Sequence, residues 1–320
     1  MKCHICLLLF CSSAVGADWQ LPRLATGEPD LQGTWTSATI TALERPRRFQ
    51  SLVLTEEQAT QWEQQNAGRF ERIDEVPDGS LEAGQNVGGY NSFWMDPGTR
   101  VLRVRGEPRS SILTYPENGL LPFRLGARLK MYQFFLGGFD GPEQRPLGER
   151  CIVGFGSTGG PPMLPVLYNN HYQIAQSPGH VMILVEMNHD ARIIRMDGQP
   201  LPTNMKPWLG DSLGHWDGDT LVVTTRNFNP GQSFRAALKH LIFLSPQAVV
   251  TERFTRISDA EIIYEFTVDD PDSYSDIWKG EMTLRQTQDS IYEYACHEGN
   301  YSLPGILRGA RVQESDNEAE

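Results

Sequence analysis

Some site motifs that would identify an enzyme class are missing from this sequence. It contains no His-Glu-x-x-His pair and no Walker phosphate loop, so the patterns typical of zinc proteases and P-loop nucleotide enzymes are absent. A glycine-rich stretch at residues 154–160 is followed by Pro161-Pro162 rather than by a helix. We therefore expect a flexible loop beside a site and not a phosphate cradle, which needs a helix N-terminus.

Basic residues are also scarce. The chain has 28 Lys and Arg against 40 Asp and Glu, a net charge of −12 and a pI near 5.1. Nucleic acids and anionic membranes are bound through a basic face, so neither is expected as a partner. No apolar run of about 18 residues follows the N-terminal segment, and no membrane span is expected.

The N-terminal segment has the pattern of a secretory signal. Lys2 precedes an apolar run at residues 3–10, and small residues follow up to Ala17, which predicts a cleavable signal peptide over residues 1–17 and a periplasmic or secreted product. Cleavage leaves two cysteines, Cys151 and Cys296. In an oxidising compartment such a pair favours a disulfide. The alternative is two buried free thiols.

Turn residues indicate the fold class. The chain has 30 Gly and 21 Pro, and from residue 101 onward short apolar stretches, including 291–295, alternate with Asp-Gly and other turn signals. This predicts a mainly β protein, an antiparallel meander closing as a barrel or a sandwich. We expect one domain over residues 18–312, in which an N-terminal arm at 18–90 carries one helix from Thr55 to about Phe70. Long loops and a disordered acidic tail at 313–320 complete the prediction.

A wider set of segments carries a resemblance. They are Gly33-Thr34-Trp35, Tyr90-Asn91-Ser92-Phe93-Trp94, Tyr168-Asn169-Asn170, residues 186–192, residues 216–223, Glu252-Arg253-Phe254, residues 264–268 and residues 295–301. In this order they resemble an uncharacterised family of predicted secreted bacterial proteins. The Gly-x-Trp ahead of a β meander is similar to lipocalin-like barrels. The resemblance implies export and one shared fold, and it assigns no catalytic residue.

The strongest candidate site follows the apolar run 181–185. Glu186, His189 and Arg192 come within seven residues. If the strand continues to residue 188, Glu186 shares a face with Met182 and Leu184 and points inward, where burial raises a carboxyl pKa and makes a usable acid or base. The alternative is a strand-end turn, with Glu186 paired to an arginine.

Two further segments carry histidines. His297 and Glu298 follow Cys296, which would hold them rigid if it is bridged, or they are exposed turn residues beside the bridge. His171 begins a strand after Asn170 and could reach the barrel mouth, although a lone histidine there is often structural. Trp94, Tyr172 and Asn170 are candidate pocket residues, and aromatic residues on strands also commonly form the core.

These candidates support two hypotheses of different kinds. The first is an exported enzyme without a cofactor, of hydrolase, lyase or isomerase type, acting by acid–base chemistry on a small molecule in the barrel. Glu186 and His189 would be acid and base, Arg192 would orient the substrate, and His171, His297 and Glu298 would assist. The second is a lipocalin-like carrier of a hydrophobic small molecule. A third, a surface interaction module, explains fewer of the histidines. A metal held by the histidines is a less favoured variant of the first.

Overall fold

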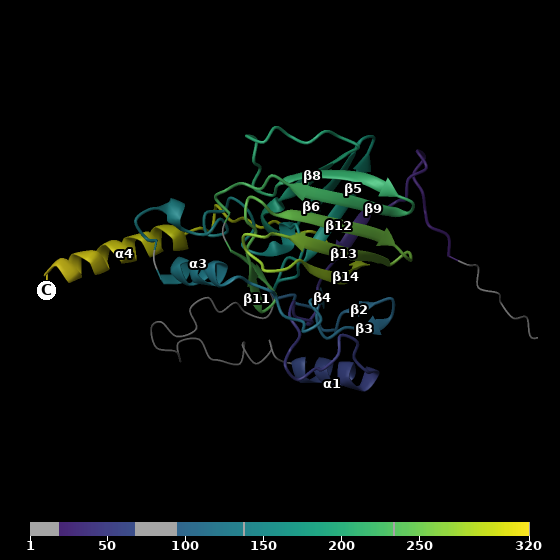
Figure 1. The fold of residues 1–320 in the computed structure, drawn as a ribbon, viewed down its shortest axis with the longest axis horizontal. Helices are drawn as coiled ribbons and strands as arrows, with labels where there is room; N and C mark the ends of the chain where they lie inside the picture. The colour runs from purple at the N-terminus through teal and green to yellow at the C-terminus, as the bar shows by residue number, and fades with distance from the viewer. Residues whose placement is uncertain (1–18, 68–94, 137, 233, 320) are drawn as a thin grey trace, which may run out of the picture.

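The computed structural model describes residues 19–67, 95–136, 138–232 and 234–319, and its body is a β-barrel (Figure 1). Ten strands form one sheet in the order β1-β5-β6-β7-β8-β9-β12-β13-β14-β4, and β1 also pairs with β14, which closes nine of them into a ring. The strands of the sheet are β1 (Gly33–Thr36), β4 (Leu113–Tyr115), β5 (His171–Ser177), β6 (His180–Val185), β7 (Ala191–Met196), β8 (Asp211–Asp217), β9 (Thr220–Arg226), β12 (Val249–Arg256), β13 (Glu261–Asp269) and β14 (Trp278–Gln286). The predicted mainly β barrel is confirmed.

The strand pairing differs from a pure antiparallel meander at one place. β7 and β8 run parallel, with Arg195 opposite Leu213, while every other neighbouring pair of the sheet is antiparallel. The Asp-Gly turn at 197–198 opens a long connection to Asp211 instead of a tight hairpin. A connection of this length lets the chain return and enter β8 in the same direction as β7. The barrel is therefore mixed.

Alternating residues fill the interior of the barrel. On β13, Ile262, Tyr264, Phe266 and Val268 are all buried, as their shared face predicts. Aromatic rings from neighbouring strands pack edge to face or tilted, with centroids 5.5 Å apart for Phe266 and Trp278. Large buried side chains occupy many of the inward-facing positions of the described strands, so this interior is packed as a hydrophobic core.

Helices and short strands surround the barrel. Thr55 caps α1 (Glu56–Asn66) by accepting a hydrogen bond from Gln58 N, and the Gln58 side chain accepts one from Thr55 N, the capping box that the sequence indicates. The last residues predicted for this helix, up to Phe70, lie outside the described residues. Two hairpins complete the strands: β2 (Arg103–Val104) with β3 (Glu107–Pro108), and β10 (Arg235–Ala237) with β11 (His240–Ile242).

The C-terminal end is helical rather than irregular. Besides α1, the described chain contains α3 (Leu125–Leu136) and α4 (Ser302–Ala319), and α4 projects away from one end of the barrel (Figure 1). The tail at 313–320, expected to be disordered, therefore continues α4 as far as Ala319. Short 3-10 turns are η2 (Pro142–Gln144), η3 (Ser157–Gly159) and η4 (Met187–His189). Among the described residues, no helix combines the length and the apolar character needed to cross a membrane.

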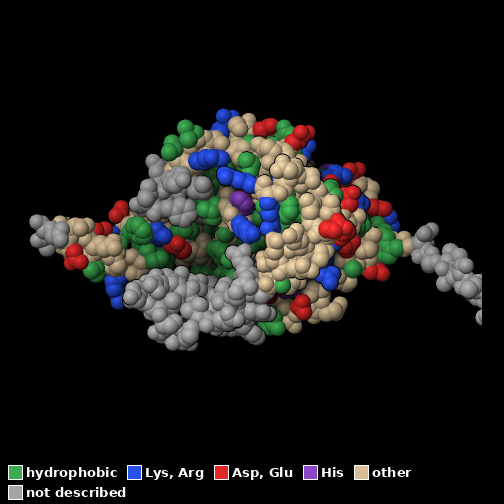
Figure 2. Space-filling model, turned by 90° about the horizontal axis from the view of Figure 1, so that it is seen from below, with side chains coloured by type: hydrophobic (Ala, Val, Ile, Leu, Met, Phe, Trp, Pro, Cys, Tyr) green, Lys and Arg blue, Asp and Glu red, His purple; other side chains and the backbone are tan. Residues whose placement is uncertain are grey.

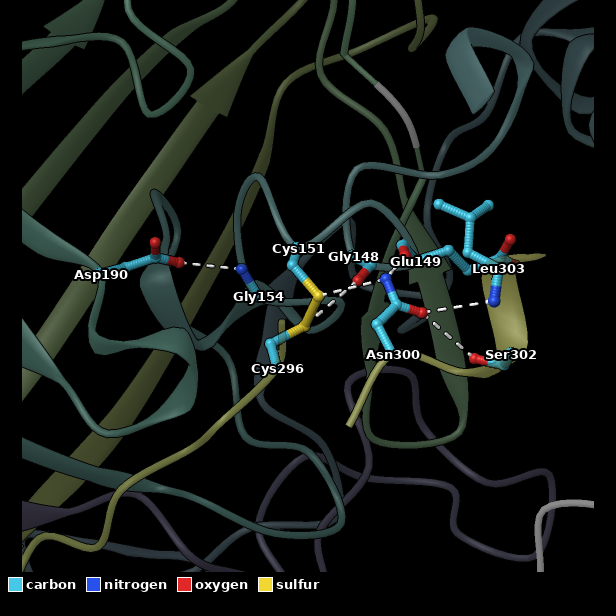
Figure 3. Close-up of a disulfide and its surroundings, with 9 residues drawn as sticks. All are labelled: Gly148, Glu149, Cys151, Gly154, Asp190, Cys296, Asn300, Ser302 and Leu303. Carbon is cyan, nitrogen blue, oxygen red and sulfur yellow. Dashed lines mark hydrogen bonds between the residues drawn. A yellow bond between two sulfur atoms is a disulfide. The ribbon is translucent and has the colours of Figure 1, made fainter. Parts of the chain in front are cut away.

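The predicted disulfide between Cys151 and Cys296 is present. Their Cα atoms lie 5.8 Å apart, and 145 positions separate them in the sequence (Figure 3). Beside the bridge, Asn300 Nδ2 donates to Glu149 O at 2.7 Å, and Asn300 Oδ1 accepts a bond from Leu303 N at the start of α4. The bridge and Asn300 together hold the segment after β14 against the loop that contains Cys151.

Candidate functional site

His171 and Glu186 form a hydrogen-bonded pair at one end of the barrel. His171 opens β5 and Glu186 directly follows β6, and the pairing of Tyr172 with Val185 brings the two side by side. Glu186 Oε2 lies 2.9 Å from His171 Nδ1 and also accepts the His171 backbone N–H at 3.3 Å. Glu186 Oε1 accepts the backbone N–H of Tyr292 at 3.1 Å. Both carboxylate oxygens are thus engaged.

The pair lies outside the barrel core. On β5, Tyr172 and Ile174 belong to the core, so the alternation of a strand directs His171 to the opposite, outer face. Glu186 is not the inward-facing strand residue that the sequence suggests, because β6 ends at Val185 and Glu186 has helical backbone angles at the start of η4. It is buried all the same, at 2 % exposure, and the Tyr292 bond shows that the segment after β14 lies against it.

Carboxylates surround the imidazole of His171. The hydrogen bond with Glu186 raises the pKa of His171 against the opposing effect of burial, and the charges of Asp96 and Asp289 add to the rise. Asp289 Oδ2 is 3.7 Å from His171 Nε2 and its side chain is 75 % exposed. Burial acts to raise the pKa of Glu186, but the hydrogen bonds from His171 and Tyr292 outweigh it and lower that pKa. The ion pair is therefore favoured over a wide pH range.

This geometry is suited to proton transfer at one defined atom. A carboxylate on Nδ1 fixes the ring and its tautomer, so that Nε2 is the atom left to give or take a proton. Nε2 is directed toward the exposed Asp289 rather than into the core. The arrangement is that of a general acid or base with an orienting carboxylate.

His189 has a different environment. It lies in η4, is exposed and has a positive φ of 53°. Its Nε2 accepts the backbone N–H of Tyr294 at 3.2 Å. The backbone N–H of Tyr292 thus binds Glu186, and that of Tyr294 binds His189. Residues 291–295 have no regular secondary structure, so the strand expected there does not form. His189 serves to anchor this segment.

Arg192 lies inside the barrel, away from the outer face that carries His171. Its Nη1 and Nη2 donate to the two carboxylate oxygens of Glu252 at 3.0 and 2.6 Å, with side-chain exposures of 1 % and 0 %. Tyr264 Oη donates to Glu252 Oε1 at 2.8 Å. The pKa of Arg192 is raised because the attraction of Glu252 outweighs a large opposing effect of burial. This is a buried structural ion pair.

The other predicted site residues do not join His171 and Glu186 as reacting groups. Asn170 is buried, and its amide bonds to Val166 and to Asp96 O, so it fastens the loop beside His171. Tyr172 is a core residue whose hydroxyl lies 3.4 Å from Ser37 Oγ, and burial raises its pKa. His297 and Glu298 are exposed in the turn after Cys296. Trp94 lies outside the described residues.

Two short patterns in the chain match catalytic or nucleotide-binding motifs without their structure. Residues 210–214 read Gly-Asp-Ser-Leu-Gly, but Ser212 lies within β8, is buried and bonds to Thr225 Oγ1 at 2.8 Å, so it is no exposed nucleophile between strand and helix. Residues 154–159 have the Gly-x-Gly-x-x-Gly spacing, yet only the turn η3 follows. This stretch is mostly buried, unlike the flexible loop expected, and Arg235 donates to the carbonyls of Gly160 and Pro161.

The described residues contain no group of three His, Cys, Asp or Glu side chains placed to hold a metal ion. His171, His189 and His297 therefore do not meet at a common point in this structure. The residues that sequence reasoning missed are Asp96 and Asp289. Asp96 is held beside His171 by hydrogen bonds to Leu167 and Asn170, and Asp289 follows β14, which pairs with β1. No local sequence pattern marks either residue.

The surface of the described residues includes two cavities. One of about 130 Å³ lies over β14 and the segment 100–103, with Arg285 on its wall. The other, of about 480 Å³, is lined by Pro46, Arg47, Arg48, Trp62, Gln65, Asn66 and Lys239. Arg48 in the second cavity stacks on the rings of Phe49 and Trp62. On the face shown in Figure 2, Lys and Arg side chains gather around a histidine at the rim of a hollow.

Comparison with known protein families, curated proteins and solved structures finds no match for this chain, so the geometry of the site carries the functional argument.

Proposed function

We propose that this protein is an exported acid–base enzyme that needs no cofactor and acts on a small molecule, with His171 as the residue that transfers a proton. Supporting this proposal is the 2.9 Å contact between His171 Nδ1 and Glu186 Oε2, which leaves Nε2 directed at the surface. Export is proposed from the N-terminal pattern, and the disulfide is consistent with it.

Each residue has one role in the proposed step. Glu186 holds the ring through Nδ1 and stabilises the imidazolium. His171 gives or takes a proton at Nε2 from a molecule bound beside Asp289. His189 and the disulfide act as positioning elements, because they hold the backbone segment that donates to Glu186. Hydrolysis, elimination and isomerisation all use such a proton transfer.

The site differs in place from the barrel cavity expected from the sequence. The proposed chemistry occurs on the outer face, between the barrel end and the segment after β14. The alternative function, a lipocalin-like carrier, needs space inside the barrel. Trp35, Tyr172 and Trp278 are fully buried in the core, and this packing weighs against the alternative.

Two measurements test the proposal. In the first, nuclear magnetic resonance follows the His171 ring through a pH titration. A pKa above 6.5 that falls in Glu186→Gln is expected, since the pair supplies the largest favourable contribution. A His171 pKa that is unchanged by Glu186→Gln would remove the orienting role of Glu186.

The second measurement is turnover of a panel of small esters, lactones and β-hydroxy acids. His171→Gln should lower kcat by about 100-fold or more, the usual range for loss of a general acid or base. His180→Gln is the matched control, because His180 is an exposed histidine at the start of β6. Equal turnover by His171→Gln and the parent protein would refute the proposal, and co-purification of an apolar ligand without turnover would favour the carrier.

A further inference from the structure

An arginine without a carboxylate partner lines the smaller cavity. Arg285 Nη2 donates to Ala38 O at 2.9 Å, and no ion pair of Arg285 within 4.0 Å is found among the described residues. Its neighbour Arg103, by contrast, is paired with Glu56 at 2.6 Å. Burial, and then the positive charge of Arg100, lower the pKa of Arg285 against the opposing charges of Asp96 and of Glu261, its cross-strand neighbour. A half-buried cation beside a second cation would be stabilised by a bound anion.

The cavity has room for a small charged group. Its volume of about 130 Å³ corresponds to about four water molecules, at roughly 30 Å³ each. Arg100 and Arg285 lie on its wall, together with the hydroxyl-bearing Thr39 and Thr283. Glu261 also lines it, which disfavours a doubly charged anion. A carboxylate fits these conditions, and arginine can bind one through two parallel hydrogen bonds.

The cavity adjoins the His171 site through β1. Thr36 on β1 pairs with His171 of β5 on one side and with Arg285 of β14 on the other. Cross-strand partners point to the same face, so the side chains of all three lie in one row on the outer surface. Two strand spacings separate the Cα atoms of His171 and Arg285, about 10 Å. The charge of Asp96 affects the pKa of both residues, which places it within reach of each.

The segment over the cavity is held close to the sheet. Gly98 has a positive φ of 79°, and a Cβ atom there would lie 2.8 Å from the backbone of Ala38 and Thr39. Gly98 therefore allows the chain from Asp96 to Arg100 to lie directly against Ala38 and Thr39, just after β1. This segment contributes Arg100 to the wall of the cavity and places the Asp96 carboxylate near His171.

We propose that this cavity binds the carboxylate of the substrate, so that the protein acts on small organic monoanions. The proposed binding of a carboxylate depends only on the residues that line the cavity. The link to catalysis rests on the proposed function of His171.

Acetate is the probe for binding, followed by amide nuclear magnetic resonance shifts of the full mature chain. Shifts that saturate and map to residues 38–39, 100–103 and 283–285 are expected, with affinity at least tenfold weaker in Arg285→Gln. Arg285→Lys should be intermediate, because it keeps the charge and loses the planar fork. Arg226→Gln is the matched control, since Arg226 is exposed at the end of another strand. If Arg285→Gln does not fold, Arg100→Gln, at an exposed position, takes its place.

Acetate binding that is equal in Arg285→Gln and the parent protein, or the absence of saturating shifts up to about 100 mM acetate, would overturn the proposal. The same binding in His171→Gln is expected. If acetate binds but His171→Gln keeps full turnover, the proposed function fails and the anion site stands. If turnover needs His171 but Arg285→Gln leaves KM for carboxylate substrates unchanged, the anion site has no role in catalysis.

Discussion

The buried pair of Arg192 and Glu252 gives the sharpest prediction about stability. Both side chains are almost completely inaccessible, and two hydrogen bonds of 3.0 and 2.6 Å join them. Replacing Arg192 by Met removes the positive charge and leaves the Glu252 carboxylate buried with only the Tyr264 hydroxyl as a donor. We expect a loss of about 3–5 kcal/mol in the free energy of unfolding, the usual cost of an uncompensated buried charge.

The double variant Arg192→Met/Glu252→Leu separates the charge from the packing. It removes both charges and fills the space with apolar atoms, and it also relieves Arg192 Nε, which has no hydrogen-bond partner. We expect most of the stability to return, to within about 2 kcal/mol of the parent protein. The Tyr264 hydroxyl loses its acceptor, Glu252 Oε1, in this variant, which sets a remaining cost of about 1 kcal/mol.

The test is urea unfolding, followed by tryptophan fluorescence, of the parent protein, the single variants Arg192→Met and Glu252→Leu, and the double variant. The reasoning is refuted if the double variant is as unstable as Arg192→Met alone, because the cost would then come from lost shape and not from an unpaired charge. A destabilisation of Arg192→Met below about 1 kcal/mol would also contradict the expected cost of an unpaired buried charge. This second outcome would mean that water reaches the Glu252 carboxylate in the variant.

Three further predictions concern other parts of the molecule. Cys296→Ser opens a loop of 145 residues and should cost up to about 5 kcal/mol in the chain-entropy model, measured by urea unfolding with and without reductant. The ion pair of His171 and Glu186 should stabilise the fold most between about pH 4.5 and 6.5. Its contribution is lost as the pH rises through the raised pKa of His171 or falls through the lowered pKa of Glu186, a dependence absent from the double Gln variant. Gly280→Ala would place a Cβ 2.3 Å from a phenylalanine ring of β13 and should lower the melting temperature by several degrees, corresponding to about 1–3 kcal/mol.

The candidate site shows where prediction from sequence succeeds and where it stops. The sequence points to both Glu186 and His171, but it places them in separate segments and groups Glu186 with its sequence neighbours His189 and Arg192. Around the turn η4 these three residues separate. Glu186 joins His171 on the outer face, His189 binds the segment after β14, and Arg192 lies inside the barrel. Residues that are close in sequence at the end of a strand need not have side chains that point the same way, because one residue with positive φ, such as Asn188, redirects the chain.

The sequence alone determined the features whose causes are local. The Thr55 capping box, the hairpin turn at residues 217–220 and the inward face of β13 depend on residues a few positions apart. The disulfide followed from counting the two cysteines left after the proposed signal.

Only the tertiary structure decided which strands are neighbours, and that choice places the site. Strand periodicity assigns each residue to a face, but it contains no information about which strand pairs with it. The pairing of β1 with both β5 and β14 brings His171 and Arg285 together on the outer surface. The parallel pairing of β8 with β7 likewise depends on how the long connection between these two strands folds back. The physical reason is that these contacts form between residues far apart in the chain, where packing of the whole barrel outweighs any local preference.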